Sequence, residues 1–459
     1  MVRPGRKTVI VGLVALGLAV TTSCSPTGEP APSPEPTMSA TSTRCRGYEE
    51  YGDLSGKAIS VYTSIVAPED QSHIDSFSTF EECTGARINY EGSREFESQL
   101  PVKIEAGSPP DIAYLPQPGL LRNLVERFPG KVMEVTGTAR RNVERNYRPA
   151  WWGHGMVEGR LHAVPVGASA KSLVWYSPQV FADNGYEVPT SWDDLVTLTE
   201  RIAAEHPEAK PWCVGLESGG STGWPATDWL EDLMLRTVTP EEYDAWVAHE
   251  FAFDDPRVVA ALDRVGAILK NPAHVNGGHG NIKSVATTPF AEAGLPILEG
   301  GCFLHRQASF YQANWPASAR IAPDGDVFAF HLPGQDAQHQ PLLSGGEFAA
   351  AFSDREEVKA FQAYLASPEW SNEKARVTPA GWVSTNTGLN PELLASPIDR
   401  LTFTLLTDEN TVVRFDASDQ MPSAVGSGTF PQAMTNWITL DRSSAQALAD
   451  VEASWPTGE

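Results

Sequence analysis

The chain has 459 residues, of which 41% are hydrophobic and 20% charged, and its formal net charge is −24. One hydrophobic core stops growing at about 250–300 residues, so this length predicts two lobes, and the ordinary composition excludes wholesale disorder. The acidic balance argues against nucleic acid and anionic lipid surfaces as partners, because both require clustered Lys and Arg. It favours a neutral ligand.

The first residues have the pattern of an export signal. Basic side chains within residues 3–7 precede an apolar run from Val9 to Val20, which is too short to span a bilayer but suits a signal peptide. Small residues precede Cys24, and this arrangement resembles the lipobox of bacterial lipoproteins, in which the cysteine is acylated. We therefore predict a signal peptide at 1–23 and lipidation at Cys24, which anchors the chain to the extracellular face of the cell membrane. A free or disulfide-bonded Cys24 is the alternative.

The segment after the predicted lipidation site is rich in Pro, Ser and Thr. Residues 25–44 contain too little apolar surface to fold, so residues 24–44 are predicted to form a disordered tether behind the lipid anchor.

Four further cysteines follow, Cys45, Cys83, Cys213 and Cys302. An even number in an oxidising compartment predicts two disulfides, for which three pairings exist. We favour Cys45 with Cys83 and Cys213 with Cys302, because each bond then stays within one lobe. No Cys-x-x-Cys or Cys/His cluster indicates zinc, and we predict neither a metal nor a cofactor.

Short apolar strands alternate with helix-length segments in the first part of the chain. The expected strands are 58–65, 86–92 and 111–115, and the expected helical stretches end at 82, run over 95–106 and begin at 119. Such alternation predicts a mostly parallel sheet covered by helices, in which ligands bind at the carboxyl ends of the strands.

A second set of elements begins near Ala163. Residues 161–181 form an extended segment long enough to cross between lobes, and Ser191 is the expected N-cap of a helix at 191–207. The later elements are a strand at 211–220, helices at 227–237 and 262–271, strands at 325–333 and 345–353, and a helix at 356–365. We predict an N-terminal lobe of 45–168 plus about 340–375, and a C-terminal lobe of 169–339 plus about 376–459.

The sequence lacks the motifs of zinc proteases and of phosphate-loop nucleotide-binding enzymes. The sequence has no His-Glu-x-x-His zinc motif, and VGASAKS around Lys171 lacks the glycine spacing of a phosphate loop. Two distant carboxylates could still meet in a cleft, so a secreted carbohydrate-active hydrolase of the glycosidase class is the alternative function.

Several short segments combine aromatic, charged and Gly residues at the expected ends of strands. A sugar presents hydroxyls, which charged or amide groups bind, and an apolar face, which stacks on an aromatic ring. The segments are 92–99, 114–119, 167–176, 217–229, 303–310, 344–348, 381–385 and 414–430. Packing is an equal alternative for any one of them, but together they favour a carbohydrate site.

The stretches YEGSREFESQL, PPDIAYLPQPGLL, PWCVGLESGGSTGWPATDWLEDLMLRT and RFDASDQMPSAVGSGTF resemble extracellular solute-binding proteins of carbohydrate ABC transporters, in their α-glucoside-binding branch. The resemblance extends over residues 48–456. It implies a two-lobed α/β periplasmic-binding-protein fold (class II type), whose lobes close by a hinge on maltose, trehalose or a related oligosaccharide. We expect a monomeric, non-catalytic protein that delivers this sugar to the permease subunits. A sensor or adhesion module that serves no importer is a third hypothesis.

The resemblance also points to ligand-binding residues. The predicted substrate-binding residues are Ser64, Arg94, Glu95, Gln117, Ser169, Trp224, Asp228, Arg306, Gly346, Glu347, Trp382, Asp419 and Phe430. Phe430 stands where the family has Trp to stack on the sugar ring, and Trp224 and Trp382 are further stacking candidates. Ser169 stands where the family has an amide or carboxylate. For each charged residue an ion pair is the alternative, and Lys171 is expected to be such a structural partner.

Overall fold

The computed structural model describes residues 44–278, 280–336 and 338–456. The predicted signal peptide, the predicted lipidation site Cys24 and the predicted tether up to residue 43 lie outside the described residues. Among the helices that the structure describes, none is long and apolar enough to cross a membrane.

Six strands form the first sheet, in the order β13-β12-β3-β1-β2, with β6 also paired to β12. They are β1 (Ala58–Thr63), β2 (Arg87–Gly92), β3 (Ile112–Leu115), β6 (Ala163–Ala170), β12 (Leu342–Ala351) and β13 (Val413–Phe415). β1 is parallel to β2 and β3, as the sequence predicts, whereas β12 is antiparallel to β3 and β6. A separate hairpin joins β4 (Met156–Val157) to β5 (Arg160–Leu161).

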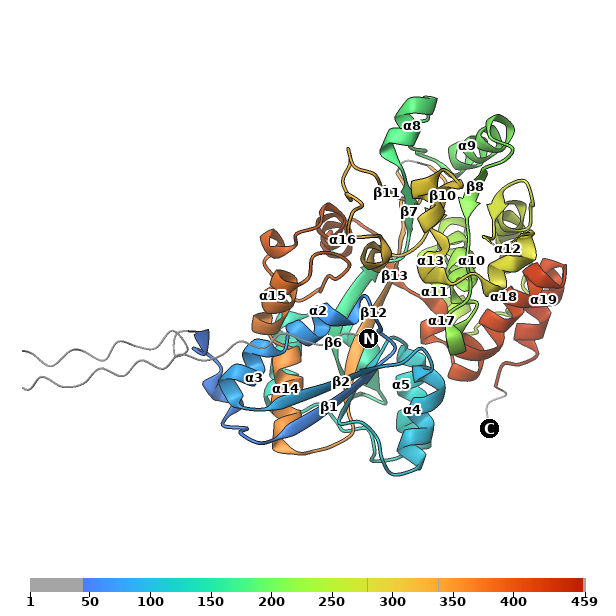
Figure 1. The fold of residues 1–459 in the computed structure, drawn as a ribbon. Helices are drawn as coiled ribbons and strands as arrows, with labels where there is room; N and C mark the ends of the chain where they lie inside the picture. The colour runs from blue at the N-terminus through green and yellow to red at the C-terminus, as the bar shows by residue number, and fades with distance from the viewer. Residues whose placement is uncertain (1–43, 279, 337, 457–459) are drawn as a thin grey trace, which may run out of the picture. The chain divides into compact units, whose positions relative to one another are not determined.

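Helices cover both faces of the first sheet (Figure 1). Alternate strand residues point to opposite faces, so Tyr62 and Ala113 pack in a core with α4 and α5, while Val61 and Tyr114 pack in a core with α3, α6 and α14. The helices of this part are η1 (Glu49–Tyr51), α2 (Asp70–Asp75), α3 (Ser78–Thr84), α4 (Phe96–Glu105), α5 (Pro118–Arg127), α6 (Gly137–Asn146), α7 (Pro149–Trp152), η2 (Gly153–Gly155), α14 (Glu356–Leu365), α15 (Pro368–Val377), η7 (Pro391–Leu393) and α16 (Pro397–Thr407).

Five strands form the second sheet, in the order β11-β7-β10-β8-β9. They are β7 (Leu173–Tyr176), β8 (Lys210–Cys213), β9 (Val275–Asn276), β10 (Cys302–Arg306) and β11 (Phe328–His331). Trp212, Trp229, Leu262 and Trp437 lie in its largest core. The helices of this part are α8 (Pro178–Asn184), α9 (Trp192–Glu205), η3 (Gly219–Ser221), α10 (Trp224–Thr237), α11 (Pro240–Val247), α12 (Pro256–Leu269), η4 (Ile282–Thr287), α13 (Phe290–Ala293), η5 (Leu295–Glu299), η6 (Ser309–Asn314), α17 (Ala417–Gln420), η8 (Val425–Thr429), α18 (Phe430–Thr439) and α19 (Ser444–Glu452).

Three segments, here called crossovers, carry the chain between the parts built on the two sheets. Lys171 and Ser172 join β6 to β7 in the first crossover, and residues 332–341 join β11 to β12 in the second. In the third, Asp416 leads from β13 to α17, and the following helices pack against α10 and α12. The first crossover lies within the extended segment expected at 161–181. Because β13 belongs to the first sheet, the third crossover follows Phe415, later than the boundary expected near residue 376.

Local sequence explains where two helices begin earlier than expected. The helix expected at 227–237 begins at Trp224, because Gly223 adopts φ 110° and Pro225 fits the first helical turn. The helix expected at 262–271 begins at Pro256, because the Asp255 side chain caps its first turn.

Both favoured disulfides are present, so the predicted pairing is confirmed. Cys45 and Cys83 join the beginning of the described chain to α3, and Cys213 and Cys302 join β8 to its neighbour β10. Each bond stays among the elements around one sheet.

The N-cap of α9 offers a test of the local structure. The Ser191 hydroxyl accepts from the Asp194 N–H at 3.2 Å, and the Asp194 carboxylate accepts from the Ser191 N–H at 3.1 Å. Ser191→Ala should lower the free energy of unfolding by about 1 kcal/mol, measured by urea denaturation. Thr197→Ala, at an exposed position of the same helix, should change it by less than about 0.5 kcal/mol. Equal losses in both variants would contradict the capping role.

Candidate functional site

A cavity of about 190 Å³ is lined by residues from elements around both sheets. Much of its wall follows the carboxyl ends of strands, with residues 64–67 after β1, Gln117 after β3, and Ser218 and Ser221 after β8. Ligands of open α/β sheets bind at this end of the strands. The lining residues are Ser64, Ile65, Val66, Ala67, Glu69, Arg94, Glu97, Pro116, Gln117, Ser169, Lys171, Ser218, Ser221, Trp224, Phe290, Ala291, Phe310, Asn314, Gly345, Gly346, Glu347, Ser418 and Asp419.

Three aromatic rings form one part of this wall. Trp224 begins α10, and its ring centroid lies 5.2 Å from that of Phe290 and 6.1 Å from that of Phe310. The Lys171 ammonium lies 5.4 Å from the Trp224 ring centroid. The Trp224 ring thus packs against two aromatic rings and a cation, and an aromatic ring can stack on the apolar face of a ligand.

Another part of the wall consists of hydrogen-bond acceptors, namely the side-chain oxygens of Gln117, Glu69 and Glu347. The Gln117 Oε1 atom is buried and has no partner among the described residues. Glu69 accepts from the Asn314 amide at a long 3.4 Å, and the Glu347 carboxylate lies beside Gly167, where a Cβ atom would overlap it. Buried acceptors without partners are costly, so these groups suit a ligand that brings donors of its own.

Burial shifts the protonation of the cavity carboxyls. It raises the pKa of Glu69 to about 7 and raises the pKa values of Glu347 and Glu97 above their usual range, because burial disfavours the charged form. A carboxyl that retains its proton can donate as well as accept. The Glu69 side chain can therefore bind a hydroxyl in either direction near neutral pH.

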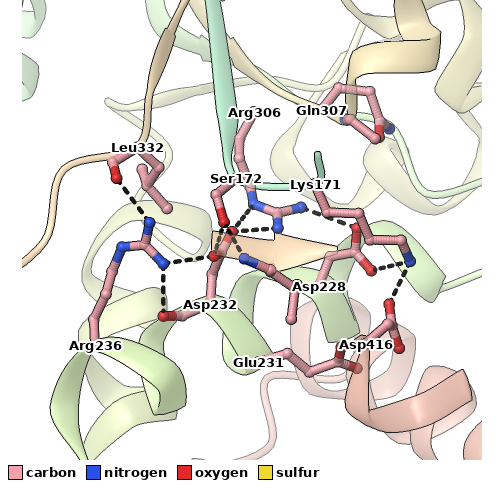
Figure 2. A network of polar contacts seen from close by, with 12 residues as sticks. Lys171, Ser172, Asp228, Glu231, Asp232, Arg236, Arg306, Gln307, Leu332 and Asp416 are labelled. Atoms are coloured by element: carbon pink, nitrogen blue, oxygen red, sulfur yellow. Dashed lines mark hydrogen bonds and ion pairs between the residues drawn. The ribbon is translucent and has the colours of Figure 1, made fainter. Parts of the chain in front are cut away.

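Lys171 connects the cavity to a buried network of charges (Figure 2). Its ammonium donates to Asp228 Oδ1 at 3.1 Å and to Asp416, and it lies 3.7 Å from Asp419. Arg306 donates to the second oxygen of Asp228 at 3.1 Å and, through Nε, to Asp232 at 2.9 Å. The cations of this network are thus held between carboxylates that come mainly from α10.

The carboxyl groups of the network have different pKa shifts. Burial raises the pKa of Asp228 to about 7, and burial together with the charge of Asp416 raises the pKa values of Glu231 and Asp419. Burial also acts on Asp416, but the Lys171 ammonium beside it holds the pKa of Asp416 below its usual range. Oxygen atoms of Asp228, Glu231 and Asp416 lie within 4.8 Å of one another, as in a metal site, but Lys171 already supplies positive charge there.

The structure brings eight of the thirteen predicted substrate-binding residues together in the cavity wall. They are Ser64, Arg94, Gln117, Ser169, Trp224, Gly346, Glu347 and Asp419. Another predicted residue, Glu95, is not part of the cavity wall, and its carboxylate lies close to Gly219 and Gly220. The charged residue Lys171 was expected to be a structural partner only, yet it is also part of the wall.

The remaining four lie elsewhere in the molecule. Asp228 and Arg306 are buried in the ion network, where protein groups already bind them. The Trp382 Nε1–H donates to the Val166 carbonyl at 3.1 Å, and the ring packs edge-on against Trp370. Phe430 is fully buried in the core around the second sheet, so it forms no part of this wall, because α18 turns it inward.

The sequence argument missed several lining residues. Glu69, Asn314 and Phe290 lie outside the strand-end segments that combine aromatic, charged and Gly residues, so the sequence pattern did not indicate them. Phe310 ends one of the quoted aromatic segments and could have been selected. Residues 219–223, GGSTG, match the Gly-x-Ser-x-Gly pattern of hydrolases and place Ser221 in the wall, but no histidine is among the lining residues that the structure describes.

Comparison with known proteins adds to this geometry. A family model described as bacterial extracellular solute-binding protein matches residues 62–371. The osmoprotective compounds-binding protein GgtB of Synechocystis sp. is 36% identical over 418 residues, which cover 90% of this chain and 96% of GgtB. The alpha-glucosides-binding periplasmic protein AglE of Rhizobium meliloti is 35% identical over 419 residues, which cover 88% of each chain.

Two solved structures show the same fold at low sequence identity. The bacterial solute receptor AcbH superimposes with a TM-score of 0.73 at 16% identity, covering 86% of this chain and 98% of AcbH. Maltose-bound MalE3 of T. maritima superimposes with a TM-score of 0.64 at 20% identity, covering 86% of this chain and 98% of MalE3. They confirm the predicted fold class, a two-lobed α/β fold.

The raised pKa of Glu69 makes a prediction about stability. In the unfolded chain this carboxyl ionises near its ordinary value of 4.5, whereas in the folded protein it keeps its proton up to about 7. Its contribution to the free energy of unfolding should therefore fall as the pH rises through this window. Glu69→Gln removes the contribution, so the stability of the variant relative to the unsubstituted protein should rise between about pH 5 and 8, measured by urea denaturation. A difference that does not change with pH would contradict the assignment.

Proposed function

Since the chain belongs to the bacterial extracellular solute-binding protein family, we propose that it binds an α-glucoside in the cavity and delivers it to the permease subunits of an ABC importer. The carrying observation is that one wall combines the Trp224 ring with the unpartnered Gln117 Oε1 atom and the Glu347 carboxylate. A sugar matches both, because its ring offers an apolar face and its hydroxyls offer donors.

The relatives support this class of ligand. AglE is named for alpha-glucosides and GgtB for osmoprotective compounds, and both align with most of the chain. The ligand that we propose is maltose, trehalose or a related oligosaccharide. The family consists of binding proteins, which favours binding without bond cleavage over the glycosidase alternative.

The proposal also includes where the protein works in the cell. We propose that the protein works outside the cytoplasm as a monomer and that acylated Cys24 attaches it to the membrane. The lipobox resemblance around this cysteine and the extracellular nature of the family support the proposal.

Removal of the central ring tests the proposed site. Trp224→Ala should weaken binding of maltose or trehalose by about 2 kcal/mol, roughly 30-fold in Kd, because the stacking surface is lost. Isothermal titration calorimetry on the mature protein measures this. The matched control is Trp455→Ala, whose ring stacks on His249 and lies outside the cavity wall, and it should leave Kd within about twofold.

The same titrations distinguish binding from hydrolysis. Chromatography of the sugar after incubation should return it intact. Products of hydrolysis, or no binding heat with any oligosaccharide of a panel, would contradict the proposed function.

A further inference from the structure

Backbone hydrogen bonds join the first crossover to the second and to β12, and join the third crossover to β12. The Lys171 N–H donates to the Leu343 carbonyl at 2.7 Å, and the Leu332 N–H donates to the Ser172 carbonyl at 2.9 Å. The first and second crossovers therefore run side by side. In the third, the Asp416 N–H donates at 2.8 Å to a carbonyl of β12, the strand that follows the second crossover.

Arg236 of α10 binds both ends of the second crossover. Its guanidinium donates to the carbonyls of Leu332 at 2.7 Å, Pro333 at 3.0 Å and Pro341 at 3.1 Å. Its charge is balanced one turn earlier on the helix by Asp232, at 2.6 Å. One side chain thus fixes the beginning and the end of a ten-residue segment whose backbone carbonyls would otherwise lack these donors.

Ser172 joins the first crossover to the same pair. Its hydroxyl donates to Asp232 at 2.5 Å and accepts from the Leu343 N–H at 2.8 Å (Figure 2). Ser172 is fully buried, as are Asp232 and the guanidinium of Arg236. This hydroxyl is therefore the point at which the first crossover, α10 and β12 meet.

The preceding turn of α10 reaches the third crossover and the cavity. Glu231 accepts from the backbone N–H groups of Ala417 at 3.0 Å and Ser418 at 3.2 Å. Asp228 binds the ammonium of Lys171, which lines the cavity. One helix therefore binds the first two crossovers, the backbone of α17 directly after the third crossover, and a residue of the cavity wall.

We propose that Ser172, Asp232 and Arg236 are positioning residues for ligand binding, which fix the crossovers and thereby the spacing of the cavity walls without touching the ligand. The contacts are directional and fully buried, and a broken buried charge contact leaves an uncompensated charge, so the loss of one partner weakens the attachment of the crossovers to α10. The affinity of the cavity then depends on residues outside it. The ligand in this statement rests on the proposed function, whereas the fixing of the crossovers does not.

The first experiment needs no ligand. Amide hydrogen exchange of the full chain compares Ser172→Ala with Ser371→Ala, a matched deletion of a fully buried hydroxyl of α15 that donates to the carbonyl of the N-cap residue Ser367. In Ser172→Ala the amides of Lys171 and Leu332, whose own acceptors are retained, should exchange about tenfold faster or more. In Ser371→Ala they should exchange at the unsubstituted rate. Unchanged exchange in Ser172→Ala, or equal acceleration in both variants, would overturn the proposal.

The second experiment measures maltose and trehalose affinity of the same proteins by calorimetry. Ser172→Ala should bind about fivefold more weakly or worse, and Ser371→Ala should stay within about twofold. Arg236→Lys, which keeps the charge but loses the planar set of donors, should act like Ser172→Ala and serves as the second variant. Faster exchange with unchanged affinity would overturn the positioning role. If neither the variants nor the unsubstituted protein bind maltose or trehalose, the proposed ligand is wrong. In that case the hydrogen-exchange result alone decides whether α10 fixes the crossovers.

Discussion

The buried charges of α10 are the constraint on which the arrangement of the molecule depends. A helix buried on all sides is normally apolar, yet α10 carries Asp228, Glu231, Asp232 and Arg236 in its interior. Each ionised group must find a partner there, since an unpaired buried charge costs several kcal/mol. The partners are Arg306 of β10, side chains and backbone groups of the first two crossovers, and backbone N–H groups of α17 directly after the third. Satisfying the helix therefore also helps to place the segments that connect the two sheets.

The cavity adjoins this network of buried charges but differs from it in how far its polar groups are hydrogen-bonded. Inside the network nearly every oxygen and nitrogen has a protein partner, whereas in the cavity wall the Gln117 Oε1 atom has no partner among the described residues. An acceptor without a partner in the same wall as the Trp224 ring marks a place where a bound ligand can supply the missing hydrogen-bond donor. Lys171 belongs to both regions, because it lines the cavity while its ammonium is held by Asp228 and Asp416.

Sequence reasoning succeeded where local chemistry decides the outcome. The parallel strands at the beginning of the fold, the Ser191 cap and both disulfides follow from alternation, capping preference and the separation of cysteines into two lobes. The strand-end segments also yielded most of the predicted cavity residues, because open α/β sheets place such segments at one edge.

The sequence did not predict which of the candidate residues are buried away from the cavity, because this depends on tertiary packing. Asp228 and Arg306 have the polarity of sugar-binding residues, but only the tertiary packing of α10 shows that protein groups already bind them. Phe430 was selected by its place in the tail, and the inward face of α18 removes it from the wall. Glu69, in the turn before α2, and Phe290, at the start of the short helix α13, reach the cavity through tertiary packing, which periodicity does not encode.

The central claim is that the cavity holds a sugar between the Trp224 ring and the side-chain acceptors of Gln117 and Glu347, and a crystal structure of the mature protein with maltose or trehalose tests it most directly. The account predicts a glycosyl ring stacked on Trp224, with hydroxyls at hydrogen-bonding distance, about 2.5–3.2 Å, from Glu347 and Gln117. A sugar bound at another surface, with this cavity filled only by water, would contradict it.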